Sequence, residues 1–80
     1  MNLEVIWPDA IRQKIAAWGL SSEGQLALIE TLDRRLQRCS EPQGIVTQEL
    51  SLPDGDYYVW MKYTKHDAKI VVVECDIEQV

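Results

Sequence analysis

No stretch of this sequence approaches the roughly 20 consecutive apolar residues that a helix needs to cross a bilayer. Its start, MNLEVIWPDA, also lacks the basic-then-apolar pattern of a signal peptide. Only two cysteines are present, Cys39 and Cys75, and their spacing fits no metal site. A disulfide is rare in a protein that is not secreted. These absences predict a cytoplasmic protein with reduced thiols, no metal site and no cofactor.

Positive charge is scarce as well. The chain has 8 Lys and Arg against 13 Asp and Glu, for a net charge of −5. Residues 1–40 hold five acids and five bases, whereas residues 41–80 hold eight acids and three bases. An acidic surface repels a phosphate backbone, so the composition disfavours nonspecific binding of nucleic acid.

The chain has the composition of an ordinary folded domain. Its 80 residues are 46% apolar and 26% charged. A chain of this length forms one domain, 1–80, and buries only about 60% of the surface of its unfolded state. We therefore expect a thin core and modest stability.

The first half predicts one short strand and two helices. NLEVIW (2–7) alternates, with Leu3, Val5 and Trp7 on one face, and Pro8 then suits the first turn of a helix. That helix reaches Trp18 and stops at Gly19. In the next helix (21–39), Ser22 and Gln25 resemble a capping box. An apolar stripe follows on Leu28, Ile29, Leu32 and Leu36.

The second half predicts three strands, which gives the order β-α-α-β-β-β. After the breaker SEPQG, residues 45–52 alternate, with Val46, Gln48, Leu50 and Leu52 on one face, and PDGD then forms a turn. The segment GDYYVWMKYTKHDAKIVVVECDI (55–77) supplies two strands joined by a turn within KHDAK. The predicted fold is α+β, with a helical hairpin on one face of a small, largely antiparallel sheet.

The last two strands are apolar on both faces, and alternation decides which face is buried. The cleaner apolar set of the last strand is Val71, Val73, Cys75 and Ile77. If the turn has an odd number of residues, the positions facing this set are Tyr57, Val59, Met61 and Tyr63. The opposite face would then display Tyr58, Trp60, Lys62 and Thr64 beside Ile70, Val72, Glu74 and Asp76. Two helices cannot cover both faces, so this second face is predicted to stay open and to bind a partner.

The β-α-α-β-β-β order and the segment at 55–77 resemble the RelE/ParE toxin superfamily, in which a Gly-x-Tyr-Arg-type strand, a polar turn and a valine-rich last strand follow one another. The resemblance covers nearly the whole chain. It implies either cleavage of messenger RNA on the ribosome or action on DNA gyrase, and neutralisation by an antitoxin segment. It also implies a basic sheet face, but Tyr58 stands where the family has an arginine, and the end CDIEQV carries no base.

Phosphoryl chemistry needs cations at the phosphate and a group that activates the attacking hydroxyl. The candidate catalytic residues left on or near the open face are Tyr58, Lys62, Lys65 and His66. His66 beside Asp67 can be a general base, although a solvated turn is the more favoured interpretation. Tyr58 and Trp60 can stack on bases, but without positive charge a protein interface is favoured.

Three further groups have a structural and a functional interpretation. Arg34, Arg35 and Arg38 can hold a phosphate or an acidic partner, but also complement the helix dipole, which we favour. The acids Glu74, Asp76 and Glu78 alternate along one strand, where a solvated edge is favoured over a metal site. Trp7, Trp18 and Cys75 are expected in the core.

The sequence thus favours a toxin-like protein, degenerate in activity, that binds a protein partner. The predicted binding residues are Tyr58, Trp60, Lys62, Ile70 and Val72. The partner is an antitoxin-like protein or a second copy of the chain as a homodimer. One alternative is a ribosome-dependent endoribonuclease, the only setting in which nucleic acid is expected as a partner. The other is a noncatalytic interaction module of unrelated role.

Overall fold

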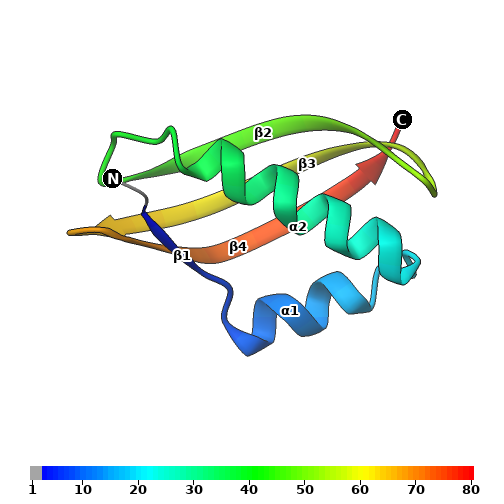
Figure 1. The fold of residues 1–80 in the computed structure, drawn as a ribbon, viewed down its shortest axis with the longest axis horizontal. Helices are drawn as coiled ribbons and strands as arrows, with labels where there is room; N and C mark the ends of the chain where they lie inside the picture. The colour runs from blue at the N-terminus through cyan, green and yellow to red at the C-terminus, as the bar shows by residue number, and fades with distance from the viewer. Residues whose placement is uncertain (1–2) are drawn as a thin grey trace.

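The structure is a computed structural model that describes residues 3–80. The elements follow the predicted order: β1 (Glu4–Ile6), α1 (Asp9–Ala16), α2 (Ser22–Leu36), β2 (Gln43–Leu52), β3 (Gly55–His66) and β4 (Lys69–Gln79). The strands form one four-stranded sheet in the order β1-β4-β3-β2 (Figure 1). β2, β3 and β4 are antiparallel neighbours, and β1 runs parallel to β4 at one edge.

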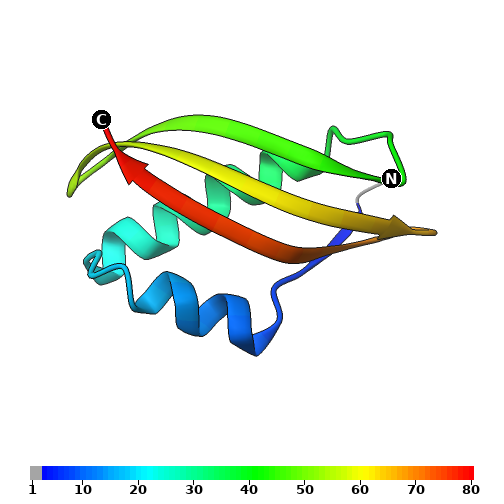
Figure 2. The same ribbon diagram turned by 180° about the vertical axis from the view of Figure 1, so that it is seen from behind.

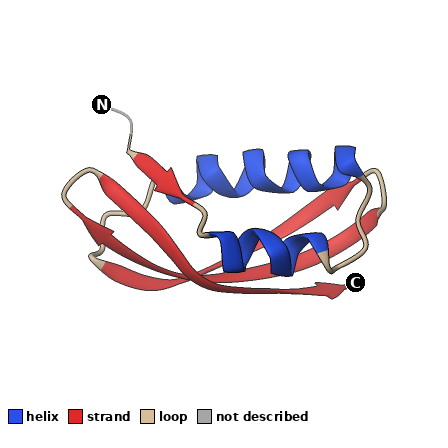
Figure 3. Cartoon of the chain, turned by 90° about the horizontal axis from the view of Figure 1, so that it is seen from below, coloured by secondary structure: helices blue, strands red, loops and turns tan. Residues whose placement is uncertain are grey.

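Both helices lie on the same face of the sheet, and no helix or strand of residues 3–80 covers the other face (Figures 2 and 3). The core between the layers contains Leu28, Leu32 and Leu36 of α2, all with no exposed surface, as the apolar stripe predicts. Ile29 packs partly buried against it, as does Trp18, while Trp7 is buried. Neither helix in the described part of the chain is long and apolar enough to span a membrane.

The N-terminus of α2 is fastened to the turn between β2 and β3. The Oγ atom of Ser21 accepts a hydrogen bond from the Gly24 backbone N–H at 3.0 Å. The sequence predicts Ser22 as the N-terminal cap of the helix, but the capping residue is Ser21. The Asp54 carboxylate in turn accepts hydrogen bonds from the Ser21 N–H at 3.1 Å and from its hydroxyl at 2.9 Å. A negative charge at this end also complements the helix dipole.

At its other end, α2 completes the outer edge of β1. The side-chain amide of Gln37 accepts a hydrogen bond from the Leu3 N–H and donates one to the Leu3 carbonyl, both at 2.7 Å. The amide therefore satisfies both backbone groups of Leu3, as a neighbouring strand would.

The predicted core members of β3 are confirmed. Val59 and Met61 have no exposed surface and Tyr63 is buried, while Tyr57 is half-buried against the same core. In β2, the alternation is also confirmed, because Val46, Leu50 and Leu52 are buried.

In β4, the predicted core face is correct for only half of the strand. The turn holds two residues, Asp67 and Ala68, because His66 pairs with Lys69. Asp67 has φ 55°, in the left-handed region that aspartate tolerates better than most residues. An even turn reverses the expected parity, so Tyr63 lies opposite Val72.

A β-bulge at Val73 then restores the original parity. The register passes from Tyr63 opposite Val72 directly to Lys62 opposite Glu74, which leaves Val73 without a partner on β3. Beyond the bulge, Cys75 is fully buried and Ile77 packs against the core, as predicted. Before it, the predicted assignment is wrong. Ile70 and Val72 have no exposed surface and belong to the core, Val73 is 45% exposed, and Val71 is half-buried on the opposite face.

The register that the two-residue turn sets in β4 can be tested on two adjacent valines of the same run. We expect Val72→Ala to lower the free energy of unfolding by about 2 kcal/mol, because it removes fully buried methyl groups. We expect Val73→Ala to change it by less than about 0.5 kcal/mol, because that side chain is exposed. Urea unfolding followed by circular dichroism measures both. The reverse order of the two losses would show that Val73 and not Val72 faces the core, as a turn with an odd number of residues would require.

The tie between the turn and α2 can be tested at Asp54. We expect Asp54→Ala to cost about 1 kcal/mol of stability, because it removes two hydrogen bonds to the capping residue and a charge that complements the helix dipole. Asp56→Ala is the matched control. Asp56 is exposed, and it is its backbone carbonyl that accepts a hydrogen bond, from the Val80 N–H at 3.0 Å, so we expect a change below about 0.5 kcal/mol. Equal losses in the two variants would contradict the capping role.

Candidate functional site: the open face of the sheet

The uncovered face of the sheet, called the open face below, carries a partly apolar surface. Tyr58 is 37% exposed and Trp60 is half-buried, both on β3 as predicted. Two exposed apolar residues were not in the predicted binding set, Ile45 on β2 and Val73 at the bulge. The alternation of β2 already placed Ile45 on the same face as Thr47, so this signal was available, whereas nothing in the run of three valines indicates the bulge.

Acidic residues surround the two aromatic side chains on the open face. On β4, Glu78 lies directly opposite Tyr58, and Asp76 lies directly opposite Trp60. On the other side, Glu49 of β2 lies opposite Tyr58. Directly opposed residues have Cβ atoms about 4.5–5.5 Å apart, so these side chains are immediate neighbours. Tyr58 therefore lies between two carboxylates, whereas Trp60 has Asp76 on one side and Thr47 on the other.

A shallow cleft of about 230 Å³ lies within this group. Its lining consists of Tyr58, Trp60, Asp76, Ile77 and Glu78. One carboxylate oxygen of Asp76 accepts a hydrogen bond from the backbone N–H of Ile77 at 2.9 Å, which fixes the orientation of the Asp76 side chain. Lys62 of β3 lies one pair further along, opposite Glu74, and is outside the cleft lining.

The structure does not bring the four candidate catalytic residues together. Tyr58 and Lys62 share the open face, but Lys65 points to the helix side, where its Nζ atom donates to the Cys39 carbonyl at 3.3 Å. His66 lies at the turn, eight residues from Tyr58 along β3, which corresponds to about 26 Å at 3.3 Å per residue. One phosphate cannot contact all four groups.

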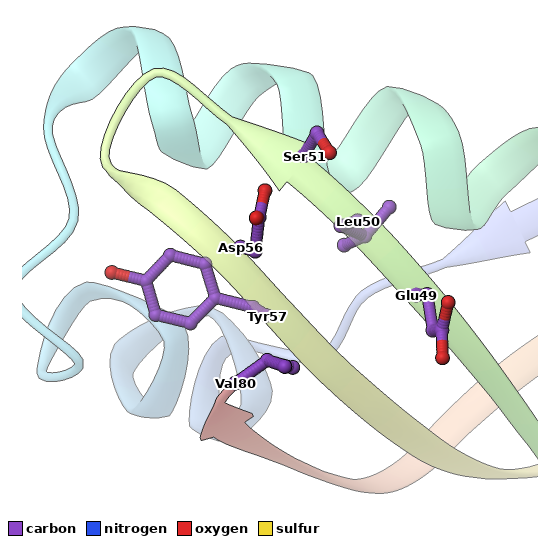
Figure 4. A pocket seen from close by; sticks show the side chains of 6 residues that line it. All are labelled: Glu49, Leu50, Ser51, Asp56, Tyr57 and Val80. Carbon is purple, nitrogen blue, oxygen red and sulfur yellow. The ribbon is translucent and has the colours of Figure 1, made fainter.

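A second cleft, of about 360 Å³, lies near the C-terminus where β2 and β3 approach their turn (Figure 4). Its lining residues are Glu49, Leu50, Ser51, Asp56, Tyr57 and Val80. None of the candidate catalytic residues is among them. Within residues 3–80, no three His, Cys, Asp or Glu side chains are arranged to hold a metal ion.

Three arginines at the C-terminal end of α2 and just beyond it line a separate groove between α2 and β2. Arg34, Arg35 and Arg38 surround about 180 Å³ together with Thr31 and Gln48. They are in the last turn of the helix and just beyond it, where positive charge complements the dipole. The groove lies on the helix side, so it is separate from the open face.

Both cysteines are free and buried. Burial raises the pKa of the Cys75 thiol to about 11, an effect that Lys14 opposes and that Asp76 and Glu74 strengthen. Burial and a side-chain hydrogen bond with Cys39 likewise raise the pKa of the Tyr63 hydroxyl. The thiolate is the nucleophilic form of cysteine, so Cys75 is not an activated nucleophile.

Comparison of the chain with models of known families, with curated proteins and with solved structures gives no match. The site is therefore interpreted from its own residues.

The raised pKa of Cys75 predicts slow alkylation in the folded protein. At pH 8, a thiol with a pKa of about 11 is almost fully protonated, whereas an unfolded thiol near pKa 8.5 is about one quarter ionised. In a Cys39→Ser variant, we expect iodoacetamide to modify folded Cys75 at least about 100-fold more slowly than the urea-unfolded chain. Mass spectrometry measures both rates. A rate in the folded state within ten-fold of the unfolded rate would mean that the thiol is accessible or ionised.

Proposed function

We propose that this chain is a toxin-like protein, similar in design to the RelE/ParE superfamily, whose open sheet face binds a protein partner. The observation that carries the partner-binding part is the uncovered apolar surface around Tyr58 and Trp60, with exposed Ile45 and Val73 on the neighbouring strands. The helices occupy the other side (Figure 2), so only another molecule can bury these side chains.

The support for the toxin-like part is the β-α-α-β-β-β order, which is the order that the resemblance implies. A gene for a small DNA-binding antitoxin next to the gene for this chain would add independent support. The endoribonuclease alternative has less support, since Lys65 and His66 lie away from Tyr58 and the cleft beside the aromatics is acidic. Carboxylates repel the phosphates of a messenger RNA, and they do not stabilise the negative charge of the transition state in which the RNA is cleaved.

An aromatic side chain at the centre of an interface is a frequent energetic anchor. Trp60 fits that position because it lies on β3, between β2 and β4, at the middle of the open face. The acidic rim around it would then exclude water and select the partner. A partner that binds here is expected to bring apolar surface for the aromatics and positive charge for the rim.

The proposal is tested with Trp60→Ala. We expect the dissociation constant of the complex with the copurifying partner, or of the homodimer, to rise at least about five-fold, since a central anchor contributes more than about 1 kcal/mol. Isothermal titration or analytical ultracentrifugation measures it on purified components.

The matched control is Leu26→Ala, which removes a 61% exposed apolar side chain on α2, on the other side of the molecule. We expect no change of affinity in this variant. An unchanged affinity and oligomeric state in folded Trp60→Ala, or equal losses in both variants, would rule out the open face as the docking surface.

A further inference from the structure

The geometry points to a receptor site for an arginine side chain of the protein partner, formed by Tyr58 and Trp60 on β3 and by Asp76 and Glu78 on β4. This inference rests on the proposed function, because it names the chemistry of the partner that the open face binds. The four side chains form a two-by-two arrangement on neighbouring antiparallel strands, with Tyr58 opposite Glu78 and Trp60 opposite Asp76.

The dimensions of the arrangement suit a guanidinium group. Along each strand, the two members are separated by two residues, which is about 7 Å, and across the strands their Cβ atoms are about 5 Å apart. The cleft that they line holds about 230 Å³, enough for the end of one long side chain. A planar guanidinium can stack on an aromatic face while its N–H groups donate to carboxylates at the side.

The charges around the cleft favour a cation over other occupants. Glu49 adds a third carboxylate on the far side of Tyr58, which therefore has acids on both sides. Lys62 lies one pair further along, opposite Glu74, and is outside the cleft lining. A pair of carboxylates beside two aromatic rings attracts a cation through charge and through the ring quadrupoles.

Arginine is favoured over lysine for two physical reasons. Its planar group can contact Asp76 and Glu78 with separate N–H donors, whereas an ammonium acts as a point charge. It is also more weakly hydrated, so that less free energy is lost when it leaves water for a half-buried site. Trp60 is the half-buried wall of this cleft, and Tyr58 is the more exposed one.

The test uses two blocked pentapeptides, Gly-Ala-Arg-Ala-Gly and the same peptide with citrulline in place of arginine. Citrulline keeps the shape of the side chain and removes its charge. The titrations follow the Trp60 side-chain N–H signal by NMR in low salt. We expect the arginine peptide to shift this signal in a saturable way, with an affinity at least ten-fold above that of the citrulline peptide.

The matched variants are Asp76→Asn with Glu78→Gln, which remove the two charges of the cleft without changing side-chain size, and Glu74→Gln as the control on the same strand. We expect the double variant to bind the arginine peptide at least five-fold more weakly than the unmodified chain. In the control variant, we expect the affinity to change less than two-fold. Equal affinities of the two peptides, or equal losses in the double variant and the control, would overturn the inference.

The same variants separate this inference from the proposed function. If Trp60→Ala weakens the full partner complex while the Asp76→Asn and Glu78→Gln double variant leaves it unchanged, the open face is a docking surface but the arginine site is wrong. If Trp60→Ala has no effect on the partner complex, the proposed function fails, and the arginine site loses the basis on which it rests.

Discussion

Two helices are enough to cover one face of a four-stranded sheet, and the rest of this structure follows from that constraint. Every strand residue must belong either to the helix-facing core or to the open face. β3 meets this constraint by strict alternation, with Val59 and Met61 in the core and Tyr58 and Trp60 outside it. The open face is therefore a direct consequence of the number and placement of the helices.

The bulge at Val73 reconciles a two-residue turn with this arrangement. A two-residue turn places positions of opposite parity across from each other, and without an extra residue Cys75 and Ile77 would face away from the core that Val59 and Met61 share. One unpaired valine corrects this over the second half of β4. It also moves the acids Glu74, Asp76 and Glu78 to the open face, where the last two become neighbours of Trp60 and Tyr58. The same irregularity thus completes the core and assembles the acidic cleft.

Charge separates the surfaces of the molecule. Arginines at and just beyond the end of α2 line a groove on the helix side, whereas carboxylates border the aromatics on the open face. The excess of acids in residues 41–80 is a fact of composition, but its functional meaning comes from the place where the strands put it. An acidic, aromatic surface suits a cationic protein partner better than a nucleic acid.

The amino-acid sequence by itself determined the order of the elements, the buried stripe of α2, the core face of β3 and the placement of Tyr58 and Trp60 on the opposite face. These features depend on local periodicity and on side-chain polarity. Three features needed the tertiary structure. The helix cap is Ser21 and not the predicted Ser22, and Ser21 is held by Asp54 from a turn that is distant in the sequence. Ile70 and Val72 belong to the core and not to the open face as predicted, because the turn and the bulge set the register of β4. Lys65 and His66 lie away from Tyr58, whereas Asp76 and Glu78 lie beside the two aromatics. Which residues are neighbours across strands depends on how the strands pair, and the sequence of one strand does not reveal that pairing.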